Sequence, residues 1–190
     1  MTKNKFDIQN YFIEVEKEVT DIISKTSTDT VTQDLLLNSD NVDHLNILKS
    51  SLKLKQLQMK IGEIWQVVIG EYDGFENLRV GHETKLDVRS VSRKLIFEIK
   101  NRYNTDNSSA RTANLNKLST FKSDNPKYTT IYGVINDTRP EGRVKIIEHD
   151  GEDIYYYSGD ELFKFIFGED KDRILSFIKN LIQKLVFDKI

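Results

Sequence analysis

The sequence predicts an α/β protein, with a mixed central sheet of about five strands flanked by helices and preceded by an N-terminal helical segment. Apolar residues recur at helical spacing near both ends of the chain, whereas short runs rich in β-branched and aromatic residues occupy its middle. A chain of 190 residues can bury a substantial core as one unit. We therefore expect a single domain over residues 1–190, with a helical part over 1–50 and the sheet-bearing core over 51–190.

The N-terminal part is expected to be helical. Four apolar residues recur within residues 8–25 at intervals of three and four, with charged residues between them: Phe12, Val15, Val19 and Ile22. After a polar break, residues 30–37 have the pattern of a short helix. A longer helical stretch over 41–70 carries an apolar stripe that includes Trp65, which we interpret as a core residue rather than a base-stacking one.

The middle of the chain is expected to form the sheet. Four runs have the composition of strands: residues 95–100, 128–135, 144–149 and 154–157. The last two are separated by Asp150-Gly151, a turn signal that predicts a hairpin. Residues 71–77, ahead of the first run, read as a turn-rich loop.

Two helices are expected after the sheet. The first contains the apolar residues of 162–167, and the second, long one covers residues 174–186. The apolar stripe of the last helix is wide, so we expect it to pack on the sheet or on a partner subunit.

Composition restricts the function classes. The chain has no cysteine, which excludes disulfides and thiolate metal sites and fits a reducing compartment. It has no apolar stretch of 18 residues and no signal-peptide pattern, so we expect a soluble cytoplasmic protein, and its richness in Lys, Asn and Ile suggests a bacterium with an AT-rich genome. The net charge of −2 argues against nucleic acid as a partner, but residues 79–127 hold eleven Lys and Arg against five Asp and Glu. This local +6 leaves DNA a candidate partner.

The segment over residues 85–100 has the strongest chemical pattern. Asp87 precedes an apolar strand that ends in Glu98 and Lys100, and strand alternation places these last two side chains on one face. A turn over residues 90–93 would let Asp87 reach the same place. Two carboxylates suit a hard cation such as Mg²⁺, and a lysine beside them can position water and face a phosphate oxygen. We therefore predict Asp87 and Glu98 as Mg²⁺ ligands and Lys100 as a catalytic residue.

This pattern, with ten residues between Asp87 and Glu98-Ile99-Lys100, resembles the PD-(D/E)XK nuclease motif, with Leu86 in place of its proline. The same spelling recurs at Glu169-Asp170-Lys171, but there it stands among charges ahead of a helical segment, so no apolar strand would present it.

Further short segments between about residues 55 and 185 resemble the small type II restriction endonucleases that cut GGNCC. In chain order they are Gly62-Glu-Ile-Trp-Gln66, Gly81-His82, Glu98-Ile-Lys-Asn-Arg102, Asn104-Thr-Asp-Asn107 and Asn125-Pro-x-Tyr128. The resemblance implies a homodimer that uses Mg²⁺ to cut double-stranded DNA, leaves 5′-phosphates and works beside a cognate DNA methyltransferase. It also implies the backbone carbonyl of Ile99 as a third metal ligand. In such enzymes a glutamate on the helix before the sheet faces the active site, a role that Glu63 would fill unless it is a surface residue.

Residues 101–122, directly after Lys100, are expected to lie against DNA bound in the active site. They begin as a polar loop and become a helix near Ser108, and arginine and asparagine are the side chains that read guanine and adenine in the major groove. The candidate DNA-contacting residues are Arg102, Asn104, Asn107, Arg111 and Lys117, together with His82 in the loop before Asp87. The alternative is an ordinary polar loop and amphipathic helix, with His82 a solvated loop residue.

The leading hypothesis is a Mg²⁺-dependent type II restriction endonuclease. A structure-specific PD-(D/E)XK repair or junction nuclease is the alternative among enzymes. Outside enzymes, the chain could be a DNA-binding module in which Glu98 and Lys100 form a structural ion pair, or an interaction protein without a nucleic-acid role. Discrete DNA fragments would distinguish the restriction endonuclease from the structure-specific nuclease. Metal-dependent cleavage would distinguish either enzyme from a DNA-binding module.

Overall fold

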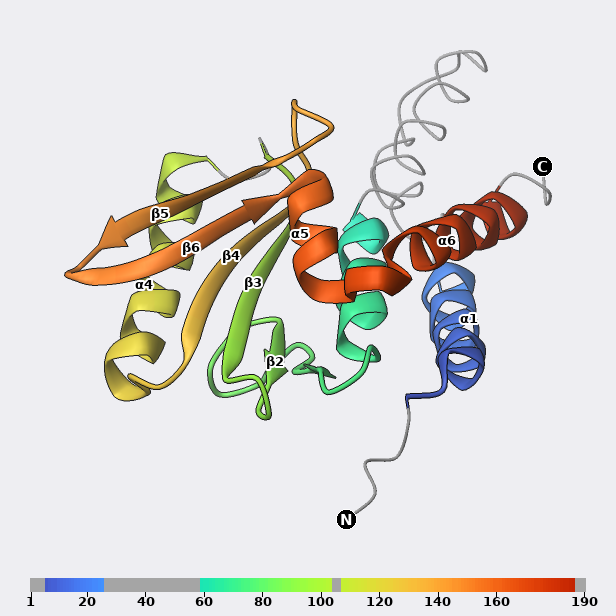
Figure 1. Ribbon diagram of the computed structural model, residues 1–190, viewed down its shortest axis with the longest axis horizontal. Helices are drawn as coiled ribbons and strands as arrows, with labels where there is room; N and C mark the ends of the chain where they lie inside the picture. Colours follow the sequence, from blue (N-terminus) through green and yellow to red (C-terminus); the bar gives the residue numbers. More distant parts are fainter. Residues whose placement is uncertain (1–5, 26–58, 104–106, 187–190) are drawn as a thin grey trace, which may run out of the picture.

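The computed structural model describes residues 6–25, 59–103 and 107–186. A six-stranded mixed sheet lies at its centre, in the order β1-β2-β3-β4-β6-β5, with helices on both faces (Figure 1). The predicted α/β class with an N-terminal helix is therefore confirmed, whereas the helices expected over 30–37 and 41–58 lie outside the described residues. Within the described ranges, no helix has the length and apolarity needed to cross a membrane.

Four strands occupy the runs predicted from the sequence, and two short strands precede them. They are β1 (Glu76–Asn77), β2 (Val88–Ser90), β3 (Leu95–Arg102), β4 (Thr129–Asn136), β5 (Arg143–His149) and β6 (Glu152–Ser158). The pairs β3–β4 and β4–β6 are parallel and the others are antiparallel. The sheet has six strands where about five were expected. The two-residue β1 lies inside residues 71–77, which were predicted as a loop, and pairs with β2. The predicted β5–β6 hairpin is present, and Asp150 and Gly151 have the positive φ angles of 51° and 76° that such a two-residue turn requires.

The helices pack on both faces of the sheet. They are α1 (Ile8–Ser24), the helical residues 59–70, α4 (Ser108–Asp124), α5 (Gly159–Phe167) and α6 (Lys171–Val186). Figure 1 shows α4 on one face of the sheet and α5 on the other, with α1 and α6 side by side beyond residues 59–70. The wide apolar stripe of α6 therefore packs within this helical layer, where Phe177 stacks on Phe12 with ring centroids 4.3 Å apart.

Strand β3 separates two hydrophobic clusters. Phe97 and Ile99 belong to the cluster shared with α1, α5 and α6, which also contains Trp65, as predicted. Ile96, on the opposite face, belongs to the smaller cluster under α4. Because side chains alternate along a strand, Glu98 points to the α4 face. The same face carries Lys100 and Lys117, which both pair with Glu98.

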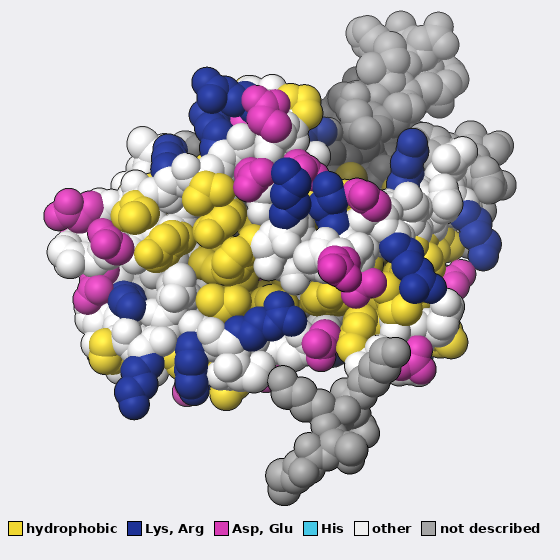
Figure 2. Space-filling view, viewed as in Figure 1, with side chains coloured by type: hydrophobic (Ala, Val, Ile, Leu, Met, Phe, Trp, Pro, Cys, Tyr) yellow, Lys and Arg dark blue, Asp and Glu magenta, His cyan; other side chains and the backbone are white. Residues whose placement is uncertain are grey.

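The α5 side of the hairpin is only partly covered. Four apolar side chains of β5, β6 and α5 are between 36% and 55% exposed: Val144, Ile146, Tyr155 and Phe165. Figure 2 shows a hydrophobic area, in yellow, over the part of the molecule formed by β5, β6 and α5. The two faces of this hairpin therefore differ, since Arg143 and Lys145 alternate with these apolar residues and point to the α4 side.

The corner after β4 contains a buried carboxylate. The side chain of Asp137 is fully buried and accepts hydrogen bonds from Arg143 Nε at 3.0 Å, Arg143 Nη2 at 2.6 Å and the Ser158 hydroxyl at 2.6 Å. Burial by itself raises the pKa of Asp137, but these hydrogen bonds outweigh it and hold the pKa well below its ordinary value.

Replacing Asp137 with alanine is expected to lower the free energy of unfolding by about 2 kcal/mol at neutral pH, because the Ser158 hydroxyl and the partly exposed Arg143 lose a charged hydrogen-bond acceptor. The native pKa is depressed, so the contribution of Asp137 is fully present above about pH 4, the ordinary pKa of an aspartate. It is then lost progressively as the pH falls toward the native pKa. Urea unfolding of both proteins at pH 7 and pH 3 measures this, and an equal difference at the two pH values would contradict it.

Candidate active site

The three residues of the motif converge between β2 and β3. Asp87 lies at the bend just before β2, and its amide donates to the Phe97 carbonyl at 3.0 Å, which extends the β2–β3 ladder by one residue. This extension turns the Asp87 side chain toward β3, where Oδ2 accepts a hydrogen bond from the Ile99 amide at 2.7 Å. Glu98 and Lys100 leave β3 on the α4 face, as strand alternation predicted.

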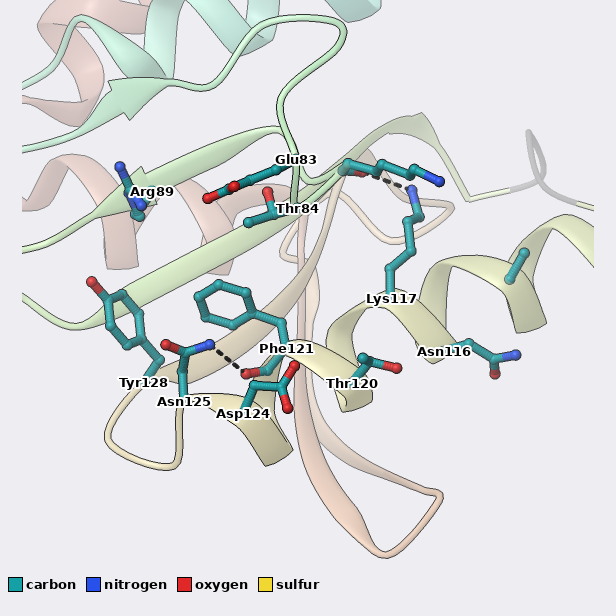
Figure 3. Close-up of a pocket in the computed structure, with 12 residues that line it drawn as sticks. Glu83, Thr84, Arg89, Asn116, Lys117, Thr120, Phe121, Asp124, Asn125 and Tyr128 are labelled. Carbon is teal, nitrogen blue, oxygen red and sulfur yellow. Dashed lines mark hydrogen bonds between the residues drawn. The ribbon is translucent and has the colours of Figure 1, made fainter.

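Glu98 is held between two lysines. Its side chain is 3% exposed, with Lys100 Nζ 2.8 Å from Oε1 and Lys117 Nζ 3.0 Å from Oε2. A buried carboxylate is costly unless it is paired, and these two ammonium groups supply that pairing. Lys117, predicted to contact DNA, thus lies beside the two carboxylates of Asp87 and Glu98, which we call the acid centre. Its Nζ also donates to the Lys85 carbonyl at 3.1 Å, and Figure 3 shows the side chain extending from α4 toward the segment before β2.

The environment of Asp87 disfavours the charged form of its carboxyl group in the absence of a cation. Burial raises the pKa of Asp87, and the negative charge of Glu98 raises it further, to about 6. The Ile99 amide and the charges of Lys100 and Lys117 act in the opposite direction but do not cancel these effects. A cation placed between the two carboxylates would favour the charged form of Asp87.

The donor atoms at this point fit Mg²⁺. The N–H and C=O of one strand residue point to the same edge, so the Ile99 carbonyl faces the side of β3 on which Asp87 binds the Ile99 amide. Asp87, Glu98 and this carbonyl together provide hard oxygen ligands, and Mg²⁺ commonly takes its remaining ligands from water and substrate phosphate. In the part of the chain that the structure describes, no cluster of three or more His, Cys, Asp or Glu could form an all-protein metal site.

The helix before the sheet presents a different residue to Asp87 than the one expected. Gln66 Nε2 donates to Asp87 Oδ1 at 2.8 Å. Glu63, one turn earlier, pairs with Lys60 at 2.7 Å and is 48% exposed. The two residues are three apart and share a helix face, so the spacing that singled out Glu63 also identified the face that carries Gln66.

The other residues predicted to bind DNA lie at the same end of the sheet or in the preceding loop. Arg102 ends β3, Asn107 caps α4 by accepting a hydrogen bond from the Ala110 amide at 2.8 Å, and Arg111 is exposed in the first turn of α4. His82 Nδ1 lies 2.9 Å from the Thr84 hydroxyl within its own loop. Asn104 is outside the described residues.

The second occurrence of the sequence pattern, at Glu169-Asp170-Lys171, does not lie on a strand of the sheet. Glu169 and Asp170 belong to a short 3-10 helix (Gly168–Asp170), and Lys171 begins α6. Asp170 accepts a hydrogen bond from the Tyr72 hydroxyl at 3.0 Å. The structure therefore agrees with the prediction that no strand presents this copy.

A groove of 740 Å³ runs between α4 and the segment before β2 (Figure 3). Its lining carries both signs of charge: Glu83 and Asp124 are acidic, and Lys85, Arg89 and Lys117 are basic. Lys117 is the point at which this groove meets the acid centre, since its ammonium binds Glu98.

A family model described as Eco47II restriction endonuclease matches residues 3–186. The chain belongs to the Eco47II restriction endonuclease family. No curated protein gives a significant match to the chain. Members of a restriction endonuclease family hydrolyse DNA, so the prediction of a restriction endonuclease is confirmed at this level. The match includes Asp87, Glu98 and Lys100, so the convergent acids and lysine lie inside the segment that defines the family.

Proposed function

We propose that this member of the Eco47II family is a Mg²⁺-dependent type II endonuclease that recognises GGNCC in double-stranded DNA and leaves 5′-phosphates. The observation that carries the proposal is the convergence of Asp87, Glu98 and Lys100 in a chain matched to the family over residues 3–186. The preference for GGNCC rests on the resemblance of the short motifs described above.

Asp87, Glu98 and the Ile99 carbonyl would hold the metal ion. When bound, Mg²⁺ neutralises the two carboxylates and stabilises negative charge on the phosphate that is cut. Lys100, beside Glu98, would orient the attacking water and stabilise the charge that develops on the phosphate oxygens. Water adds to phosphorus as the bond to the 3′-oxygen breaks, so the phosphate stays on the 5′ end and the 3′-oxygen leaves as a hydroxyl.

Two further residues would position these groups. Gln66 holds one oxygen of Asp87, and the Ile99 amide holds the other. Lys117 holds one oxygen of Glu98 and is itself anchored by the Lys85 carbonyl. Both contacts fix carboxylate orientation, which a site of this kind needs for rate. Glu63 would act only through solvent, because its side chain pairs with Lys60.

The DNA would lie across the end of the sheet where β3 and β4 finish. Arg102, Asn107 and Arg111 lie at this end, and Asn104 and His82 complete the residues proposed to contact DNA. GGNCC is two-fold symmetric, so a homodimer in which each copy cuts one strand fits the proposed site. A single domain over residues 1–190, a cytoplasmic bacterial location and a cognate methyltransferase complete the proposal.

Digestion of a sequenced phage genome tests the function. With Mg²⁺ the protein should produce discrete fragments whose ends map to GGNCC and can be ligated, and EDTA should prevent cleavage. The Asp87→Ala variant serves as the control for contaminating nucleases. Fragments ending at another sequence would reject GGNCC but keep the restriction activity. Uncut DNA from a folded preparation would reject cleavage of ordinary duplex DNA and favour a structured DNA substrate or a binding module.

A further inference from the structure

A small pocket of 130 Å³ lies on the α4 face of the sheet, near the ends of β3 and β4. Three positively charged residues from two elements line it: Arg111 of α4, and Arg143 and Lys145 of β5. Among the described residues that line this pocket, none is acidic. The mixed-charge groove beside Lys117 differs in this respect, since two acids line it. The small pocket is therefore suited to an anion.

The strand register places this pocket in line with the acid centre. One row of paired residues crosses the sheet from Glu98 on β3 to Lys145 on β5, and the next row on the same face runs from Lys100 to Arg143. The residues between them are Tyr132 and Tyr156 in the first row and Val134 and Ser158 in the second. Three strand spacings of about 4.8 Å separate the Cα atoms of Lys100 and Arg143 by about 14 Å. This distance corresponds to a few nucleotides along one DNA strand.

The three basic side chains keep donor groups that a bound anion could use. Asp137 fixes the Arg143 guanidinium through two N–H groups, which leaves three of its five donors. Lys145 Nζ lies 4.9 Å above the ring of Tyr156. Within the described parts of the chain, the guanidinium of Arg111 has no acidic partner. Three cations against one carboxylate leave an excess of positive charge around the pocket.

We propose that this pocket binds one backbone phosphate of the DNA, a few nucleotides from the phosphate that is cut. A phosphodiester offers one negative charge and two acceptor oxygens, which match guanidinium and ammonium donors. The stacked rings of Tyr132 and Tyr156, 6.1 Å apart, form the floor, and the exposed Tyr103 lies at the rim. The proposal rests on the proposed function and extends it, because it assigns Arg143 and Lys145 to DNA binding.

Anisotropy titrations with a labelled duplex test the pocket, using the cleavage site found by digestion and Ca²⁺ in place of Mg²⁺. Arg111→Ala and Lys145→Ala remove exposed side chains, and melting curves verify that both variants fold. Each should weaken binding by roughly three- to tenfold and reduce the slope of log affinity against log salt by about 1. A duplex without the cleavage site should lose affinity by the same factor, because phosphate contacts carry no sequence information. Lys179→Ala, on the exposed side of α6, is the matched control.

Single methylphosphonates locate the phosphate. Neutralising the contacted phosphate should weaken DNA binding by the wild-type protein. It should cause no further loss of affinity in Lys145→Ala. If both variants keep the wild-type salt slope, or lose affinity only for the specific site, the pocket assignment is wrong while cleavage and the proposed function stand. If the wild-type protein neither cuts DNA nor binds it in a salt-dependent way, the proposed function fails and the pocket assignment fails with it.

Discussion

Asp87→Asn is expected to reduce DNA cleavage by at least about a thousandfold, since Asp87 is a proposed metal ligand and its loss would remove several kcal/mol of transition-state stabilisation. Asparagine has nearly the shape of aspartate and can still accept the hydrogen bond from the Ile99 amide. Gln66 can turn its amide and remain in contact with position 87. Duplex binding should therefore persist, because the fold and the cationic surface do not change.

The same variant is expected to melt at a higher temperature than the wild-type protein when no divalent cation is present. The pKa of Asp87 is raised to about 6, so the ionised carboxylate destabilises the folded state at neutral pH. The cost is at most about 3 kcal/mol. For an acid whose native pKa is raised, this cost is fully present above the native pKa and disappears below the ordinary one. The advantage of Asp87→Asn should thus decline from pH 7 to pH 4.

Thermal melts at pH 7 and pH 4 in EDTA, together with cleavage and binding assays, measure these effects. Glu83→Gln is the matched control, because it removes an exposed carboxylate from the neighbouring groove. It should leave both stability and cleavage at wild-type values. A variant at position 87 that still cuts DNA would remove Asp87 from the active site. One that melts below the wild-type temperature at pH 7 would contradict the electrostatic cost.

The residues that were found from the sequence are those that local rules determine. Strand alternation places Glu98 and Lys100 on one face, and the turn after β2 returns the chain past Asp87. A helix beginning near Ser108 was predicted, and Asn107 caps it through a hydrogen bond from an amide three residues away. Each of these relations involves neighbours in sequence or on a single hairpin. They can therefore be predicted without knowing how the layers pack.

The residues that were missed depend on packing between layers. Periodicity shows that Glu63 and Gln66 share a helix face, but only the rotation of the helix against β2 decides that Gln66 reaches Asp87. Lys117 was recognised as a cation near DNA, yet its contact with Glu98 requires the position of α4 over the sheet. Strand β1 was missed because two residues are too few to show alternation.

Lys100 and Lys117 both bind Glu98, and their replacement by methionine is expected to separate two roles. Lys100→Met should reduce single-turnover cleavage by about a thousandfold, the loss typical of a group that assists proton transfer. Lys117→Met should reduce cleavage by only about tenfold, the lower end of the range typical of contacts that position a metal ligand. Lys117 has two anchors in the protein, Glu98 and the Lys85 carbonyl, so its contacts are those of a residue that orients another.

Cation binding gives a readout that does not depend on cleavage. Lys117 is an ammonium 3.0 Å from Glu98 Oε2, and its positive charge repels a cation bound by this carboxylate, so its removal should strengthen Ca²⁺ binding in calorimetric titrations without DNA. Lys100→Met should strengthen it for the same reason, which shows that its loss of cleavage does not come from loss of the cation. Lys127→Met, an exposed lysine after α4, should change neither quantity. Equal loss of cleavage in Lys100→Met and Lys117→Met would mean that Lys117 shares the catalytic role. Weaker Ca²⁺ binding in Lys117→Met would mean that this lysine supports cation binding instead of opposing it.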